Sequence, residues 1–387
     1  MSKKSLLFVT WSLTLGGGEA QSTINILNNI NLNKYDVDVL EFNHGDKKIK
    51  VSKEINFLES IINYKQNHYQ KSIFNKYIRH PEMITNIIKK DYDCVIACNR
   101  GSTSLLGTFI KAKKRIVWIR GSIENLNYNK IIDPLDKENV KDKYKQQDKI
   151  FDHYNRIVAV SDSVYNSLEQ LFPRHKDKLV KIYNSVDVDH IIKLSNETIE
   201  SYLPSKENCI VSVGRLREVK NHKLLIDAMK NLITKRNDTE LIIIGEGLLE
   251  TELNEYIKNN NLEQYVKLVG FYPNPFPLEK KAKIFCLSSD SEGFCLAISE
   301  ACVLGIPFIS TDVGGAQEIL KTKECGCIIP RDPEVLANKI DLFLNNQKLY
   351  DYLKHNCFIA RQRFDVKKLG NQVEDLIDQL FEDNNYN

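Results

Sequence analysis

The chain has 387 residues, of which 42% are hydrophobic and 27% charged, and this globular composition is long enough for two domains of roughly 150–200 residues each. No apolar run reaches the roughly 18 residues that a membrane-spanning helix needs, and the first residues resemble a strand more than a signal peptide, so we expect a cytoplasmic protein. A net charge of only +3, with no aromatic-basic recognition motif, argues against nucleic-acid binding.

Short runs rich in Val, Ile and Leu alternate with helical patterns along the whole chain, which is typical of parallel sheets covered by helices. Because these runs are almost continuously apolar, we expect strands buried on both faces. The sequence therefore predicts an α/β protein with two Rossmann-like parallel-sheet domains in tandem. The expected strands of the first domain are Ser5–Thr10, Tyr35–Phe42, Asp93–Cys98, Arg115–Arg120 and Arg156–Ser161. Those of the second are Cys209–Gly214, Glu240–Gly245, Val266–Gly270, Ala282–Ser289, Ile306–Thr311 and Gly326–Pro330.

The stretch 184–206 is polar and lacks a strong apolar period, so we place the domain boundary there. The expected domains are residues 1–186 and 187–365. Residues 366–387 form a closing helix with an apolar face to bury, because apolar side chains recur at three and four positions. These side chains are Val373, Leu376, Ile377 and Leu380.

The end of the first strand is followed by "WSLTLGGGEAQ", which contains Gly16 and Gly17. Ligands of open α/β sheets bind beyond the carboxyl ends of strands. Glycines there let the backbone approach a ligand closely, and the next helix directs its N-terminus at negative charge. The segment does not match G-x-G-x-x-G, so a nicotinamide site is not supported. A plain turn is the alternative interpretation.

The first strand of the second domain is followed by "GRLREVKNH", which contains Arg215 and Lys220. Two cations on a loop that enters a helix are well placed to hold a diphosphate that leaves as an anion. A solvated basic loop is the alternative.

The stretch "SSDSEGFCLAISEACVLG" places Glu292 in a loop and Glu300 about two turns into an apolar helix. Backbone N–H groups of Phe294, Cys295 and Leu296 at the helix start could bind phosphate. Glu292 alone could be an acid favoured by the helix dipole, but Glu300 needs a partner inside so apolar a helix. Sugar and ribose hydroxyls are such partners, so the pattern favours a nucleotide-sugar.

The segment "EGFCLAISE" resembles the E-x7-E motif of retaining family-4 glycosyltransferases with the GT-B fold. The segments "LGGGE", "VSVGRLREVKNH", "LIIIGEG" and "GIPFISTDVGGAQEIL" are similar to family segments in the same order, so the resemblance covers nearly the whole chain. It implies two domains facing a cleft and a C-terminal helix that returns to the first domain.

The resemblance also implies roles for individual residues. Glu300 would bind the ribose, Glu292 the donor sugar, and Arg215 with Lys220 the diphosphate. It implies a UDP-linked nucleotide-sugar donor as substrate, and no metal or other cofactor. The remaining donor-site residues that it implies are Gly16, Gly17, Gly214, Gly245, Glu246, Phe271, Gly293, Phe294, Cys295 and Leu296.

Arg120 departs from the family pattern. Many relatives carry a histidine after a first-domain strand, in a context like W-[IV]-H, whereas this chain reads "VWIRGSIE". An arginine cannot act as a base at neutral pH, but it can bind phosphate or an acidic acceptor through two hydrogen bonds. A strand-end arginine in solvent is the alternative.

Residues 1–120 hold 19 Lys and Arg against 10 Asp and Glu, a net charge of +9, so the rest of the chain carries −6. Such a surface attracts anionic lipid head groups or phosphate-bearing acceptors. Within it, a helical pattern with basic residues and aromatic anchors suggests a contact with an anionic membrane surface, or alternatively an apolar stripe that packs on the sheet. Its residues are Tyr69, Lys71, Ile73, Lys76, Tyr77, Ile78 and Arg79.

The nine cysteines are scattered, and several lie in apolar runs, as expected of buried thiols in a reducing compartment. Cys325 and Cys327 form a C-x-C pair without the second pair of a structural zinc site, so we expect no metal there.

We expect a metal-independent retaining transferase that moves a hexose or N-acetylhexosamine to a lipid-linked or glycan acceptor at the inner face of the membrane. The alternatives are a nucleotide-sugar epimerase of the same fold and a catalytically altered nucleotide-binding partner subunit.

Overall fold

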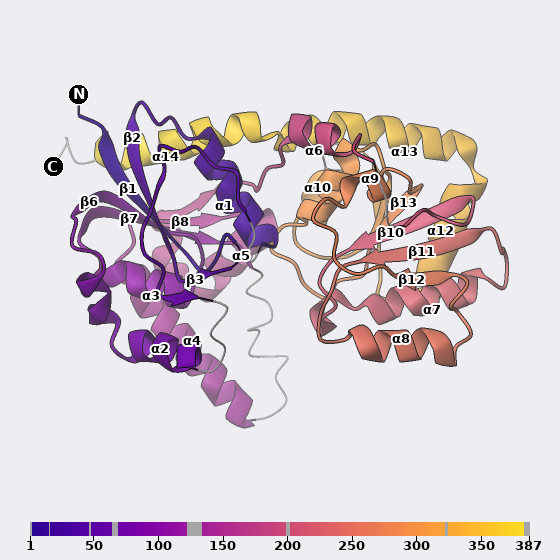
Figure 1. The fold of residues 1–387 in the computed structure, drawn as a ribbon, viewed down its shortest axis with the longest axis horizontal. Coiled ribbons are helices and arrows are strands. Elements are labelled where there is room, and N and C mark those ends of the chain that lie inside the picture. Colours follow the sequence, from indigo (N-terminus) through magenta and orange to yellow (C-terminus); the bar gives the residue numbers. More distant parts are fainter. Residues whose placement is uncertain are drawn as a thin grey trace. The chain divides into compact units, whose positions relative to one another are not determined.

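The computed structural model describes residues 2–14, 16–45, 48–63, 69–121, 134–198, 202–321 and 324–382. The chain divides into two compact units (Figure 1). Unit 1 comprises Met1–Ser185 and Val366–Asn387, and unit 2 comprises Val186–Asp365. Among the described residues, none of the helices combines the length and the apolar character needed to span a bilayer.

Unit 1 contains a seven-stranded sheet in the order β4-β2-β1-β6-β7-β8-β9. All of its neighbouring strands pair in parallel, and β1 pairs with β2 on one side and β6 on the other. The strands are β1 Lys4–Thr10, β2 Tyr35–Glu41, β4 Asn56–Phe57, β6 Tyr92–Ala97, β7 Ala112–Ile119, β8 Arg156–Ala159 and β9 Leu179–Lys181. A small parallel ladder joins β3 (Asn43–His44) to β5 (Ile62–Asn63).

The helices of unit 1 are α1 Gly18–Asn29, α2 Tyr69–Arg79, α3 Ser102–Phe109, α4 Pro134–Asp152, α5 Asp162–Leu171 and α14 Leu369–Glu382. The closing helix α14 packs against α1 (Figure 1). The four apolar side chains expected on its buried face are all at most 4% exposed. The approach to α1 is so close that a Cβ at Gly370 would lie 2.1 Å from the carbonyl oxygen of Asn29.

Unit 2 contains a six-stranded parallel sheet in the order β12-β11-β10-β13-β14-β15, and all six predicted strands are present. Its strands are β10 Asn208–Val213, β11 Thr239–Ile244, β12 Val266–Leu268, β13 Ile284–Leu287, β14 Phe308–Thr311 and β15 Gly326–Ile329. Its helices are α6 Val188–Leu194, α7 His222–Leu232, α8 Glu250–Asn259, α9 Phe276–Glu279, α10 Leu296–Val303, α11 Ala316–Leu320, α12 Pro333–Asn345 and α13 Gln347–Ala360.

The prediction of two parallel α/β sheets is therefore confirmed. In unit 2 the chain runs outward from β10 in one direction through β11 and β12, and outward from β13 in the other through β14 and β15. The carboxyl ends of β10 and β13 consequently form a topological switch point, the place where ligands of open α/β sheets bind.

Candidate active site

Two loops leave the sheet of unit 2 at the switch point. One runs from Gly214 to Lys220 after β10, and the other from Ser288 to Glu292 after β13. The Asp290 N–H donates to the Val219 carbonyl at 2.8 Å, and the Ser288 hydroxyl donates to the Lys220 carbonyl at 2.9 Å. The two predicted donor-binding segments are thus held together by hydrogen bonds.

Lys220 and Glu292 form an ion pair between these loops. The Lys220 Nζ lies 2.6 Å from the Glu292 Oε1, and the Ser289 hydroxyl donates to the same oxygen at 2.6 Å. Both charged side chains are largely shielded from solvent, 25% and 16% exposed, whereas Arg215 on the same β10 loop is exposed. Both donors thus share the Glu292 Oε1.

His222 supports the β10 loop at the start of α7. Its Nε2 lies 3.3 Å from the Arg215 carbonyl, so the tautomer with the proton on Nε2 donates a hydrogen bond there. Burial lowers the pKa of His222 to about 4, which keeps the ring neutral at physiological pH. The sequence analysis missed this supporting residue.

Helix α10 begins beside the same loops. The Leu296 N–H donates to the Phe294 carbonyl at 2.9 Å. Of the three N–H groups expected to bind phosphate, this one therefore already has a hydrogen-bond partner at the start of the helix. The Cys295 thiol donates to the Gly314 carbonyl at 3.0 Å. Gly315 has φ 89°, and a Cβ there would lie 2.7 Å from the Cys295 nitrogen, so only glycine lets this loop lie so close to the start of α10.

Glu300 is a partly buried carboxyl in the second turn of α10. Burial raises its pKa to about 7, so the protonated and ionised forms coexist at neutral pH. A carboxyl of this kind can exchange hydrogen bonds with hydroxyl groups in either form.

Glu279 in α9 is a second buried acid that the sequence analysis missed. Its side chain is fully buried, and neither carboxyl oxygen has a hydrogen-bond partner among the residues that the structure describes. Burial, and next the charge of Glu300, raise its pKa well above the usual range. Because Lys280 and Lys281 follow it directly, the sequence pattern is that of an exposed charge cluster, and it gave no sign of this burial.

Replacing Glu279 with methionine is expected to stabilise the protein by about 1–3 kcal/mol at pH 8, because a buried polar group without a partner carries that cost. The folded-state pKa of Glu279 is raised, so the folded protein retains a proton that the unfolded chain releases once the pH exceeds the ordinary carboxyl pKa. Its contribution to stability therefore falls as the pH rises, and the gain from Glu279→Met is expected to be larger at pH 8 than at pH 5. Thermal melts of both proteins at the two pH values measure the difference.

The control for this prediction is Glu279→Gln, which keeps the size and polarity of the side chain but cannot ionise. It is expected to remove the pH dependence assigned to Glu279. Identical pH dependence of melting in the wild type and in Glu279→Gln would contradict the assignment.

The loops after β11 and β12 adjoin the β10 loop. The Gly245 N–H donates to the Gly270 carbonyl at 2.8 Å, and the Leu216 N–H donates to the Glu246 carbonyl at 2.9 Å. A Cβ at Gly245 would lie 2.0 Å from the Gly214 carbonyl oxygen, so these backbones meet only because glycine stands there. The side chain of Glu246 is exposed, and that of Phe271 is 44% exposed.

In unit 1 the predicted glycines lie in the loop that follows β1. Gly16 has φ 73° and Gly17 has φ 102°, which are left-handed values that favour glycine. Glu41, at the end of β2, holds the preceding residues through Oε1, which accepts from the Leu13 and Thr14 N–H groups at 2.7 and 2.9 Å. Burial opposes ionisation of Glu41, but hydrogen bonds from the Thr14 hydroxyl, the Thr14 N–H, His44 and Ser12 keep its pKa below the usual value. Sequence reasoning missed this acid.

Arg120 lies directly after β7 and is buried, 7% exposed, so the alternative of a solvated strand-end arginine is wrong. Its Nε donates to the Cys98 carbonyl at 3.0 Å, and its Nη1 donates to the Ser22 hydroxyl and, at 3.1 Å, to the Asn184 Oδ1. Its Nη2 has no hydrogen-bond partner among the described residues. The guanidinium therefore joins strand ends to α1.

A cavity of about 320 Å³ lies in unit 1 among α2, α3 and α4. Its lining is mainly apolar, and Arg100 and Lys143 contribute positive charge.

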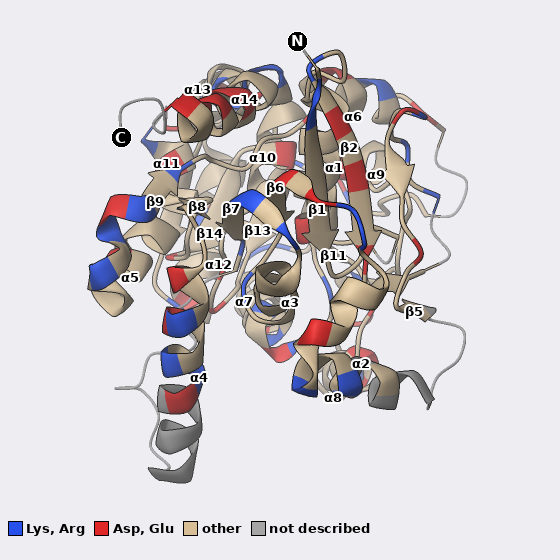
Figure 2. Ribbon diagram, turned by 90° about the vertical axis from the view of Figure 1, so that its left-hand side faces the viewer, with Lys and Arg blue, Asp and Glu red and all other residues tan. Residues whose placement is uncertain are grey.

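In helix α2, Ile78 lines this cavity and Tyr77 packs against the core of unit 1, as the packing alternative for this helix predicts. Lys76 and Arg79 are exposed, and Figure 2 shows basic positions along α2. The side chains of Tyr69 and Lys71 lie outside the described part of the chain.

Residues 195–358 match the protein family described as glycosyl transferases group 1. The matched segment contains Arg215, Lys220, Glu292 and Glu300.

Two relatives and one solved structure extend this finding. The N-acetylgalactosamine-N,N'-diacetylbacillosaminyl-diphospho-undecaprenol 4-alpha-N-acetylgalactosaminyltransferase of Campylobacter jejuni is 33% identical over 216 residues, 55% of this chain and 57% of the relative. The chain thus spans little more than half the length of that relative. An uncharacterised glycosyltransferase of Haemophilus influenzae is 22% identical over 95% of this chain and 98% of its own. The Anabaena protein HepE, solved with UDP-glucose, shares the fold with a TM-score of 0.74 at 19% identity, over 97% of this chain and 100% of its own.

Proposed function

We propose that the protein is a retaining glycosyltransferase that moves a hexose or N-acetylhexosamine from a UDP-sugar to a lipid-linked or glycan acceptor. The observation that carries this proposal is the Lys220, Glu292 and Ser289 cluster at the switch point of unit 2, with the partly buried acid Glu300 on the helix that begins there. Cations suit the diphosphate of such a donor, and acids suit its hydroxyl groups. The solved complex of HepE with UDP-glucose supports this choice of donor.

The ion pair suggests how donor binding prepares the site. Lys220 neutralises Glu292 at 2.6 Å. We propose that the diphosphate takes Lys220 as its own partner, and that Glu292 then accepts hydrogen bonds from the hydroxyls of the donor sugar. Arg215 adds a second positive charge from solvent, and Glu300 binds the ribose hydroxyls.

The reaction then follows from where charge develops. The bond between the sugar C1 and the diphosphate oxygen breaks, and negative charge grows on the leaving diphosphate, where Lys220 and Arg215 stabilise it. The acceptor hydroxyl attacks C1 from the same face, and its proton passes to the departing phosphate oxygen. A new C1–oxygen bond to the acceptor forms with the original configuration.

Transfer is expected to continue at an unchanged rate in EDTA, because two cationic side chains supply the charge that a divalent ion supplies elsewhere. The sequence contains Asp-x-Asp pairs at Asp36/Asp38, Asp91/Asp93 and Asp187/Asp189, a pattern that can bind divalent ions, but one acid of each pair has a partner in the chain. The Tyr92 hydroxyl donates to Asp38 at 2.6 Å, the Ser5 N–H donates to Asp93, and Asp187 caps α6. UDP release with and without EDTA measures this. Loss of transfer in EDTA that Mg²⁺ or Mn²⁺ restores would contradict metal independence.

We propose that the acceptor binds to unit 1, whose basic residues and apolar cavity suit a lipid that carries a phosphate. The Campylobacter relative, whose name specifies a diphospho-undecaprenol substrate, supports a lipid-linked acceptor. Binding to anionic vesicles at low salt, released at high salt, is the expected result of a flotation assay with the full chain. No binding to anionic vesicles at low salt would contradict the proposed membrane contact.

A donor screen that monitors nucleotide release tests the proposed activity. The wild type is expected to release UDP from one UDP-sugar only when acceptor is present, and Glu292→Gln is expected to release little. NMR of the glycan product is expected to show the anomeric configuration of the donor. Epimerisation of the donor without acceptor would identify an epimerase instead, and nucleotide binding without either reaction would identify a binding subunit.

A further inference from the structure

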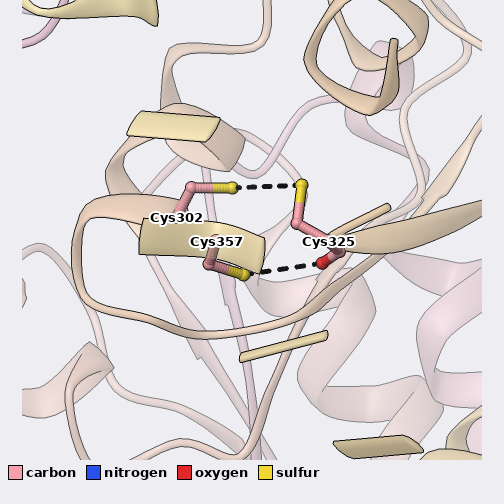
Figure 3. Close-up of side chains that lie close together, drawn as sticks. All are labelled: Cys302, Cys325 and Cys357. Atoms are coloured by element: carbon pink, nitrogen blue, oxygen red, sulfur yellow. Dashed lines mark hydrogen bonds between the residues drawn. The ribbon is translucent and has the colours of Figure 1, made fainter. Parts of the chain in front are cut away.

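Three buried cysteines converge inside unit 2 (Figure 3). Cys302 lies in the last turn of α10, Cys325 directly precedes β15, and Cys357 lies in the last turn of α13. Each is at most 1% exposed, and their three Sγ atoms all lie within 4.8 Å of one another. The three cysteines are separated by 23 and 32 residues in the sequence, so a search for C-x-x-C motifs does not find this cluster.

The sulfur positions match those of a metal–thiolate site. Metal–sulfur bonds of about 2.3 Å place two sulfurs about 3.8 Å apart in a tetrahedral site and about 4.0 Å apart in a trigonal one. The Sγ atoms of Cys302 and Cys325 are 3.9 Å apart, far beyond the roughly 2.05 Å of a disulfide. A shift of less than 1 Å brings the Cys357 Sγ to the sulfur–sulfur distances of such a metal site.

The surroundings favour a cation at the centre of the cluster. The last turns of α10 and α13 both contribute to it, and the carbonyl end of a helix carries partial negative charge. Among the described residues, no histidine, acid or fourth cysteine joins the three. Sulfur ligands select soft ions such as Cu⁺ and Zn²⁺, and a site closed by three sulfurs suits Cu⁺ better than Zn²⁺, whose structural sites have four ligands.

We propose that Cys302, Cys325 and Cys357 bind one thiophilic d10 cation, Cu⁺ or Zn²⁺, at a structural site. Binding displaces the thiol protons and forms three metal–sulfur bonds, with no change in the oxidation state of sulfur. The ion would join α10, which carries Glu300, to β15 and α13. It lies outside the proposed donor site and takes no part in the transfer reaction.

Metal analysis of the purified full chain tests this proposal. Because the sulfurs are buried, the ion must enter as the chain folds, so cells are grown with added copper or zinc and the protein is purified anaerobically with a reductant. The wild type is expected to hold about one ion per chain, and elemental analysis shows which metal it is. X-ray absorption at the edge of that metal is expected to show sulfur ligands at about 2.3 Å.

Variants assign the ligands. Cys302→Ser, Cys325→Ser and Cys357→Ser are each expected to lose most of the metal, whereas Cys327→Ser, two residues from Cys325, is expected to retain it. Where a variant fails to fold, the metal content and the X-ray absorption spectrum of the wild type still show whether the three cysteines bind a metal ion. A metal-free wild type from both growth media, a Cys302–Cys325 disulfide in peptide mapping, or equal metal in all folded variants would overturn the proposal. Since UDP release is measured separately, failure here leaves the proposed transferase activity untouched.

Discussion

Replacing Lys220 with alanine is expected to lower kcat by about 10²- to 10³-fold, the cost of removing one preorganised group that stabilises developing negative charge. Lys220 is held 2.6 Å from Glu292 in a largely shielded position, so its ammonium acts in a less screened environment than that of a surface lysine. The diphosphate gains charge as the glycosidic bond breaks, so kcat is expected to fall more than KM rises. Steady-state kinetics of UDP release measure both constants.

The matched control is Lys223→Ala, in the first turn of α7. Lys223 is exposed and lies over the ring of Tyr256 at 4.6 Å, away from the ion pair. Its loss is expected to change kcat less than twofold, because exposed charges contribute little. Equal effects of the two substitutions would show that Lys220 acts only through the general charge of the surface.

Glu300→Gln is expected to raise KM for the donor by roughly 10- to 100-fold, since a hydrogen bond to a charged acceptor is worth about 1.5–3 kcal/mol. The pH dependence gives the sharper result. The pKa of Glu300 is raised to about 7, so the carboxylate is lost as the pH falls through 7, and donor affinity of the wild type is expected to fall with it. The glutamine variant cannot ionise, so this part of the pH dependence is expected to vanish.

Donor KM at pH 6 and pH 8, for the wild type and Glu300→Gln, measures the effect. Glu255→Gln is the control, because Glu255 is exposed on α8. A wild type whose donor KM is the same at both pH values, or a variant that retains the full pH dependence, would contradict the ribose-binding role.

The strands of unit 2 could be predicted because each is an almost continuous apolar run, as in β11, which is buried at every position. The loops of the candidate site could be located because ligands of such sheets bind where the strands end. On this basis Arg215, Lys220 and Glu292 were correctly predicted to follow strands. The 2.6 Å ion pair could not be predicted, because it depends on the loop hydrogen bonds that join Asp290 to Val219.

Other features depend on contacts between segments that are distant in the sequence, and local sequence patterns do not reveal such contacts. Glu279 is preceded by Leu278 and followed by lysines, so only the folded structure shows that its carboxyl is buried with no hydrogen-bond partner in the described part of the chain. Arg120 could be placed at a strand end, but its burial results from Ser22 and Asn184, which belong to other elements. For the same reason the cysteine cluster is visible only in three dimensions.

A crystal structure of the full chain with UDP tests the central claim most directly. We predict that the ribose hydroxyls lie within hydrogen-bond distance of the Glu300 carboxyl and that the diphosphate contacts Lys220 and Arg215. A nucleotide bound away from the ends of β10 and β13, or a ribose out of reach of Glu300, would contradict it.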